Sequence, residues 1–209
     1  MSKTLFSAYD LTLKVKDEGE YLMKTLESAF IARDFEMHFE QPINGDEDVN
    51  FGGHYSMKSK ALGRRHYANI AFFLDLHREV CNGDWEHGKS SLFSFGFSPV
   101  YEEGWFDCGM RLSSNGQLTL EGTEEESSHY KADSSGYLIE FVGPEVARPK
   151  VPRTKHLNTR TWMFSVPLEA LHNREAAISE IVDPAVAMII DGKLPKVAFK
   201  DRSAVIFPS

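Results

Sequence analysis

The sequence predicts an α+β fold in which a mainly antiparallel sheet carries about three helices within a single domain, 1–209. Two observations support this class. Segments with strand-like alternation outnumber helical ones, and they are joined by hairpin signals rather than by regular βαβ crossovers. The chain has 209 residues, of which 42% are hydrophobic and 12% aromatic, enough for one sizeable core. A sub-boundary near residues 143–155 is the alternative, and it would leave each half a thin core.

The N-terminal region predicts a strand followed by a helix. Residues 4–16 contain apolar residues at every second position (Leu11, Leu13 and Val15), which is typical of a strand. Asp17 and Glu20 then have the spacing of a capping box, which indicates that a helix begins there.

The next two elements are a short strand over 35–39 and a long helix over 61–81. Apolar residues recur through the second segment at intervals of three and four, which predicts an amphipathic helix. Asn82-Gly83 follows it directly and is expected to end it.

The middle of the chain predicts strands. Residues 92–100 alternate Phe93, Phe95 and Phe97 with small residues, as a strand with one buried face does. Segments 105–112 and 117–121 flank Ser114-Asn115-Gly116, which is a hairpin signal. A further strand is expected over 137–142.

The C-terminal region predicts a strand over 161–166 and a helix over 167–182 that Asp183-Pro184 ends. The apolar tail from residue 185 onward predicts two or three strands around an Asp191-Gly192 turn.

Composition favours a soluble cytoplasmic protein. The first residues lack the plan of a signal peptide, and no run of about 20 apolar residues is present. Only Cys81 and Cys108 occur, too few for a secreted disulfide scaffold. The net charge of −8 repels nucleic-acid phosphates on average.

Charge is distributed unevenly along the chain. Residues 101–145 hold ten acidic residues against two basic ones, a net charge of −8, whereas residues 146–174 carry a net charge of +5. The second segment contains the proline-broken stretch ARPKVPRTK, which cannot lie inside a regular element. A dense carboxylate surface repels itself unless something basic meets it, so this reversal is the strongest functional signal in the sequence.

Motifs for metal or nucleophilic chemistry are weak. His77 and Cys81 would converge on one face of the predicted helix, and His87 and Cys108 could complete a zinc site, but no metal-binding signature supports this set. The acidic loop 44–50 lacks the glycine and glutamate positions of a calcium-binding EF-hand. No cofactor is therefore expected.

The sequence favours a non-enzymatic interaction protein that binds, and inhibits or neutralises, a basic face of a larger protein, as an immunity-type protein in a prokaryote would. Nucleic-acid mimicry is a related mode. The residues expected to contact the partner are Tyr101, Glu102, Glu103, Trp105, Glu121, Glu124, Glu125 and Glu126. The alternative is an enzyme acting on phosphate-containing substrates, including nucleic acid. It would use His54 and His156 for acid–base chemistry and Arg148, Lys150, Arg153 and Lys155 for anion binding.

Overall fold

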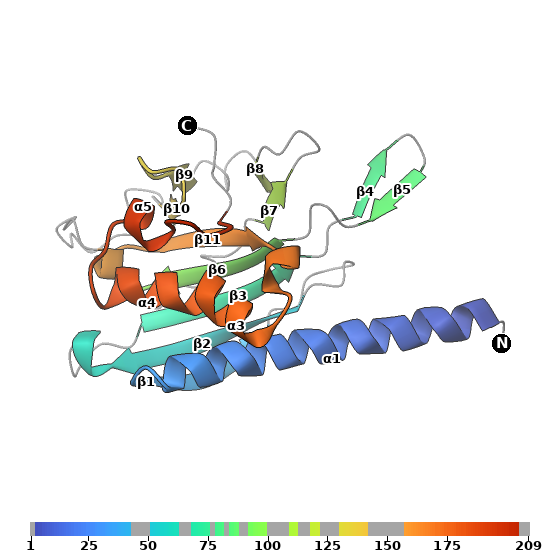
Figure 1. The fold of residues 1–209 in the computed structure, drawn as a ribbon, viewed down its shortest axis with the longest axis horizontal. Helices are drawn as coiled ribbons and strands as arrows, with labels where there is room; N and C mark the ends of the chain where they lie inside the picture. The colour runs from blue at the N-terminus through green and yellow to red at the C-terminus, as the bar shows by residue number, and fades with distance from the viewer. Residues whose placement is uncertain are drawn as a thin grey trace.

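The computed structural model describes residues 3–42, 51–62, 68–75, 78–81, 84–87, 92–99, 109–112, 118–121, 130–141 and 157–204. A seven-stranded sheet lies at the centre, and every strand pairing in it is antiparallel (Figure 1). Its strands, in spatial order, are β1 (Phe35–Pro42), β2 (Phe51–Ser59), β3 (Ala68–Asp75), β6 (Leu92–Ser98), β11 (Trp162–Pro167), β10 (Ile139–Phe141) and β9 (Tyr130–Ala132).

Two further antiparallel hairpins accompany the sheet. They are β4 (Arg78–Cys81) with β5 (Asp84–His87), and β7 (Gly109–Leu112) with β8 (Leu118–Glu121). The helical elements are α1 (Lys3–Ile31), α3 (Arg174–Ala177), α4 (Asp183–Ile189), α5 (Pro195–Ala198), the π-helical turn η4 (Ile178–Val182) and the 3₁₀ turns η1 (Lys60–Leu62), η2 (Leu157–Thr159) and η3 (Leu168–Leu171). The predicted α+β class with a mainly antiparallel sheet is confirmed.

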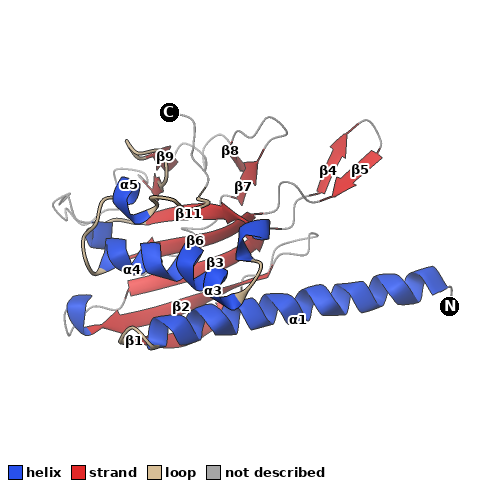
Figure 2. Cartoon of the chain, in the orientation of Figure 1, coloured by secondary structure: helices blue, strands red, loops and turns tan. Residues whose placement is uncertain are grey.

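The helices pack on one face of the sheet, which we call the helix face (Figure 2). Phe95 occupies its centre, where its ring lies 5.7 Å from that of Phe30 in α1 and 5.4 Å from that of Phe164 in β11. The helices contribute further buried side chains, including Leu26, Ile181 and Met188. Because each large aromatic side chain removes about 150–250 Å² from water, this cluster is the main source of burial energy.

A glycine eases a close approach of side chains near the edge of the helix face. A Cβ atom at Gly53 in β2 would lie 3.0 Å from the ring of Tyr55 and 3.1 Å from that of Phe39 in β1. The same two rings contact each other edge to face at 5.4 Å. The bare glycine therefore lets β1 and β2 pack their aromatic side chains together.

The expected strand over 4–16 is wrong, because α1 runs without a break from Lys3 to Ile31. The alternation of Leu11, Leu13 and Val15 covers only five residues, and so short a window is compatible with both periods. The helix that was expected to begin at Asp17 is the second half of this longer helix.

The expected helix over 61–81 is also wrong, because this segment contains β3 and β4. The five consecutive residues from Ala68 to Phe72 are all buried. A strand that is buried on both faces loses the alternating pattern, and its apolar residues then match helical spacing by chance.

The C-terminal expectations need three corrections. The helix expected from residue 167 starts as the 3₁₀ turn η3, and its α-helical part begins only at Arg174. Asp183-Pro184 does not end the helix, because η4 joins α3 to α4 and the helical path continues to Ile189. The Asp183 amide donates to the Ile178 carbonyl, five residues back, and this wider turn makes room for the proline ring. The strands expected after residue 185 are instead α4 and α5, although the chain does turn between them near Asp191-Gly192.

The remaining strand predictions are confirmed with small changes of boundary. They correspond to β1, β6, β10, β11 and the β7–β8 hairpin, in which Gly109 pairs with Glu121. Within the part of the chain that the structure describes, no helix combines the length and apolar character needed to cross a bilayer.

Candidate functional site

Most residues expected to contact a partner lie outside the described residues. These are Tyr101, Glu102, Glu103, Trp105, Glu124, Glu125 and Glu126, and the expected anion-binding set Arg148, Lys150, Arg153 and Lys155 lies outside them as well. Glu121 is described as the last residue of β8. Within the acidic segment, the β7–β8 hairpin is therefore the described part that lies nearest to these residues in the sequence.

The other described acidic residues of segment 101–145 include two with internal partners. Both carboxylate oxygens of Asp133 accept hydrogen bonds within the turn that joins β9 to β10, from Ser135 and from the Leu138 amide. Gly136 takes a positive φ of 75° in that turn, which glycine adopts without strain. Asp133 thus stabilises a hairpin and is unavailable as a simple surface charge.

Glu140 pairs with a residue of the basic segment. Its Oε1 lies 2.8 Å from Nη1 of Arg160, and both side chains are partly buried. Such a charge-assisted hydrogen bond is stronger than an exposed ion pair. At this point the acidic and basic segments lie together and neutralise each other locally.

The sheet face opposite the helices mixes buried polar side chains with buried apolar ones such as Leu92 and Met163. We call it the polar face, after the hydroxyl and amide groups described below. Phe93, Phe95 and Phe97 of β6 point to the helices, so the residues between them point the other way. Ser94 Oγ lies 2.7 Å from Ser165 Oγ, and Ser98 Oγ lies 2.9 Å from the Thr161 hydroxyl. Both bonds join β6 to the β11 side of the sheet.

Asn69 lies in the same row as Ser98, paired with it across β3 and β6. Its side chain is only 4% exposed, and among the described residues its Nδ2 is a buried nitrogen without a hydrogen-bond partner. A buried donor left without an acceptor costs about 1–3 kcal/mol. The polar face therefore holds one unsatisfied group beside several satisfied ones.

His54, an expected acid–base residue, lies in β2 on the polar face, two residues from Ser56. Partial burial lowers the pKa of His54 below its usual value, so the imidazole is neutral near pH 7. Ser56 Oγ donates to Glu40 Oε1 at 2.5 Å. The other expected histidine, His156, lies outside the described residues.

The zinc ligands considered from the sequence lie on strands where they are described. Cys81 lies in β4, where it is paired across the hairpin with Asp84. His87 lies in β5, where it is paired with Arg78. His77 and Cys108 lie outside the described residues. A search of the described residues finds no group of three or more His, Cys, Asp or Glu side chains able to hold a metal ion. The acidic loop 44–50 also lies outside them.

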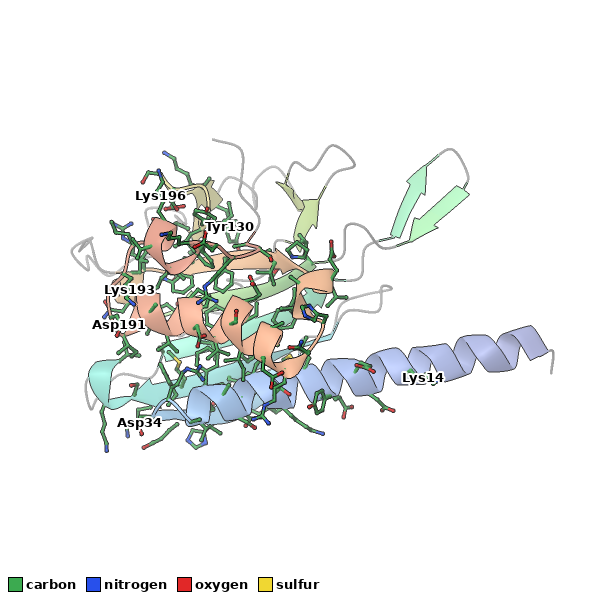
Figure 3. All side chains as sticks on the ribbon, viewed as in Figure 1. Lys14, Asp34, Tyr130, Asp191, Lys193 and Lys196 are labelled. Carbon is green, nitrogen blue, oxygen red and sulfur yellow. The ribbon has the colours of Figure 1, made fainter. Side chains whose placement is uncertain are left out.

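A pocket of about 310 Å³ lies where α1, α4 and α5 end. Arg33 bonds the Ala29 carbonyl and Asp183, whereas Arg202 bonds the Ala198 carbonyl and Ser179. Lys193 and Asp191 form a second ion pair on its rim (Figure 3). Because cations at the C-terminal ends of helices balance the helix dipoles, these contacts make the pocket a structural junction.

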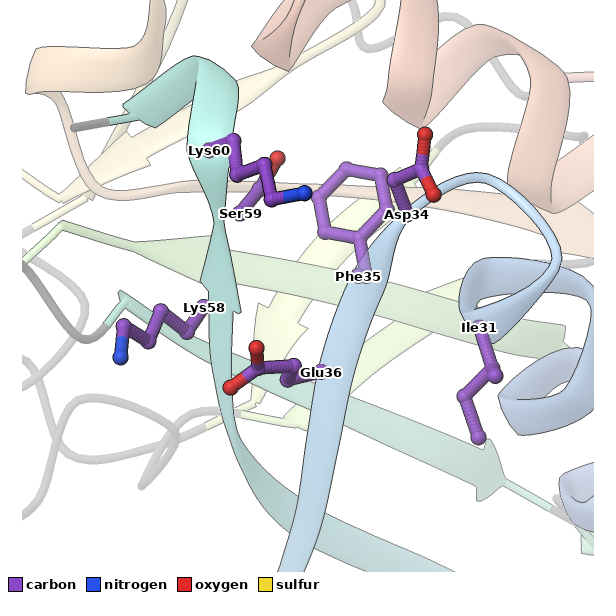
Figure 4. Close-up of a pocket in the computed structure, with 7 residues that line it drawn as sticks. All are labelled: Ile31, Asp34, Phe35, Glu36, Lys58, Ser59 and Lys60. Carbon is purple, nitrogen blue, oxygen red and sulfur yellow. The ribbon is translucent and has the colours of Figure 1, made fainter. Parts of the chain in front are cut away.

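A second pocket, of about 240 Å³, lies between the start of β1 and the end of β2 (Figure 4). Asp34 and Glu36 line one side, and Lys58 and Lys60 line the other. Asp34 takes a positive φ of 64°, a conformation that aspartate tolerates in turns. The opposite charges are balanced, so this pocket does not select for either an anion or a cation.

These features define an α+β protein with one apolar and one polar sheet face. No protein-family model matches the chain, and neither the curated proteins nor the solved structures include a significant match.

Proposed function

We propose that this chain is a cytoplasmic, non-enzymatic interaction protein that binds, and inhibits or neutralises, a basic face of a larger protein. The observation that carries the proposal is the net charge of −8 in residues 101–145. Self-repulsion makes such a density costly unless a basic surface meets it. A complementary partner would gain both faster association and selectivity over partners of the same sign.

The β7–β8 hairpin supports the proposal by its position. It lies beside the sheet on the side away from α1 (Figure 1). Acidic residues precede and follow this hairpin in the sequence, including Glu102, Glu103 and Glu124 to Glu126. A hairpin with charged flanks is a suitable base for a binding surface because its strands fix the ends of the flanking segments.

Asp133 and Glu140 are excluded from the contact surface. One is used in a turn and the other is paired with Arg160. The proposal therefore depends on the other carboxylates of the segment, with Tyr101 and Trp105 as aromatic anchors among them.

The test is a charge reversal of three adjacent residues, Glu124→Lys, Glu125→Lys and Glu126→Lys. Tagged wild-type and variant proteins are used to capture partners from native cells at about 50 and about 300 mM salt, which changes electrostatic screening. We expect the wild type to retain a basic partner whose recovery falls with salt, and the variant to lose it.

The matched control reverses three exposed carboxylates elsewhere, Glu36→Lys, Glu169→Lys and Glu175→Lys. It makes the same change in net charge, and we expect it to keep the partner. If the first triple variant captures the same proteins with the same salt dependence as the wild type, the proposal is wrong.

A second candidate is an enzyme acting on phosphate-containing substrates, and the neutral His54 imidazole on the polar face favours it. A neutral histidine can accept a proton in catalysis near pH 7. In this alternative, His156 would be its partner, and Arg148, Lys150, Arg153 and Lys155 would bind the phosphate.

Hydrolysis of phosphomonoester and phosphodiester substrates by the wild type, His54→Ala and His156→Ala proteins separates the two candidates. The enzyme alternative requires wild-type turnover that both variants lose. Turnover that survives both substitutions would exclude these residues from catalysis.

A further inference from the structure

Helix α1 is longer than the sheet on which it packs. Its 29 residues span about 44 Å at 1.5 Å per residue, and strand β2, with nine residues, spans about 30 Å. The second half of α1 packs on the helix face through Leu26, Ala29 and Phe30. The first half extends beyond the edge of the sheet (Figure 1).

An extended half-helix of this kind would gain stability from a surface to pack on. Isolated helices of fewer than about 12–15 residues are marginal in water, since most helical stability comes from packing. Residues 3–16 nevertheless include Leu5, Phe6, Leu11 and Leu13, together with three lysines and one aspartate, a net charge of +2.

The second half of α1 presents a solvent face of opposite charge. Residues 17–31 carry a net charge of −3, and Asp17, Glu18 and Glu20 are exposed. Two large apolar side chains are exposed with them, Tyr21 at 61% and Ile31 at 51%. One helix therefore carries a basic half and an acidic half that complement each other.

We propose that two copies of this chain associate through an antiparallel α1–α1 pair with its twofold axis at Asp17. In that register the residues at positions i and 34 − i lie at the same level. Lys14 is then level with Glu20 of the second copy, Asp10 with Lys24, and Leu13 with Tyr21. Two of these pairings join opposite charges and one joins apolar residues, and each pairing occurs at two symmetry-related levels.

The same positions follow one helix face. Residues 10, 13, 14, 17, 20, 21 and 24 are separated by intervals of one or three, which places them along one side of a helix. Lys14, Asp17, Tyr21 and Lys24 of this set are exposed, and Figure 3 marks Lys14 on the extended part. Moving the axis by one residue in either direction leaves a single opposite-charge pairing, Lys14 with Glu18 for an axis at residue 16 and Lys16 with Glu20 for an axis at residue 18.

The register also has one unfavourable level, because Asp17 meets Asp17 of the second copy at the axis. Like charges at close range oppose association. Asp17→Asn should therefore strengthen the dimer. A basic partner bound to this acidic half of α1 would instead lose an attractive charge, so the sign of the effect distinguishes the dimer from that occupant.

The first test measures mass by sedimentation equilibrium from about 5 to about 200 µM protein, which brackets the micromolar affinity of a small polar interface. We expect a monomer–dimer equilibrium built on the 23.7 kDa chain. A monomer throughout this range overturns the proposal and leaves α1 to another occupant.

The second test is a charge exchange. Lys14→Glu and Glu20→Lys each place like charges at two symmetry-related levels, so each variant alone should associate at least about tenfold more weakly. An equal mixture of the two variants restores both pairs in a heterodimer and should regain wild-type affinity. A mixture no tighter than its components overturns the antiparallel register.

Two controls keep the result interpretable. Lys196→Glu changes an exposed lysine on α5 and should leave association unchanged. Circular dichroism of each α1 variant verifies that the helix still forms, because Glu20 also pairs with Lys24 in the same helix at 3.7 Å.

A cross-link locates the axis directly. Asp17→Cys should form a disulfide-linked dimer on mild oxidation, above the background from Cys81 and Cys108. Ser28→Cys, exposed on the same helix, should not, because the two Ser28 levels lie about 33 Å apart in this register. Efficient cross-linking at Ser28 instead of Asp17 contradicts the assignment.

Discussion

The two faces of the sheet are stabilised by different physical means. On the helix face, four rings from three elements surround Phe95, with centroid distances of 5.4 to 5.9 Å to Phe30, Phe72, Trp162 and Phe164. On the polar face, paired hydroxyls such as Ser94 and Ser165 join neighbouring strands. Both faces of β6 are buried, so burial alone does not distinguish them.

The two faces therefore make different contributions: one supplies stabilising free energy, and the other favours one alignment of the strands. Aromatic packing supplies a large burial energy that tolerates small adjustments of position. A buried hydroxyl pair contributes little net energy, but it penalises any register in which its members lose their partners. We infer that the helix face provides most of the stability, whereas the polar face fixes how β6 and β11 align.

The largest expected effect is from Phe95→Ala at the centre of the helix face. Removing this fully buried ring should lower the free energy of unfolding by about 3–5 kcal/mol, measured by urea denaturation. The matched control is Phe39→Ala, whose side chain is 56% exposed and should cost less than about 1 kcal/mol. Equal losses for the two variants would contradict the assignment of the core.

The fold class could be predicted from the sequence because a strand whose two faces differ in chemistry shows a clear alternation of residue types. Phe93, Phe95 and Phe97 alternate with Ser94, Gly96 and Ser98, so the sequence of β6 itself shows the contrast between the two faces. The segment of β3 carries no such contrast, since Asn69 and Ala71 are as buried as Ile70 and Phe72. Its identity as a strand depends on neighbours that one sequence does not reveal.

Helices α4 and α5 were expected as strands for a related reason. Residues 185–190 form a continuous apolar run rich in β-branched side chains, which favours a strand locally. In the structure, Ala185, Met188 and Ile189 pack against the sheet, and tertiary packing overrides the local preference. The π-helical turn before Pro184 is likewise a local adjustment that a proline rule does not foresee.

The candidate site was only partly predictable. The charge reversal and His54 are visible in the sequence, and His54 does lie on the polar face. The pairing of Glu140 with Arg160 spans 20 residues and that of Ser94 with Ser165 spans 71. Contacts of this kind depend on the order of strands in the sheet, for which the sequence carries no local signal.

A smaller effect is expected on the polar face from Ser94→Ala. Loss of its hydrogen bond to Ser165 should cost about 1 kcal/mol. A double-mutant cycle with Ser165→Ala isolates the interaction, and we expect a coupling energy of about 0.5–1.5 kcal/mol from urea denaturation. A coupling energy of zero would show that the two hydroxyls do not stabilise the alignment of β6 with β11.

The smallest effect is a pH dependence that arises on the polar face alone. Because burial lowers the pKa of His54 in the folded protein, the unfolded chain binds a proton at a higher pH than the folded chain does. Stability should therefore fall as the pH is lowered through the ordinary histidine range near 6.5, and level off below the depressed pKa.

His54→Gln should remove this part of the pH dependence between about pH 7 and 5. His172→Gln, which changes an exposed histidine, serves as the control and should keep it. If both variants retain the wild-type slope in urea denaturation, His54 is solvated in the folded protein, and the polar face is less buried around β2 than around β6.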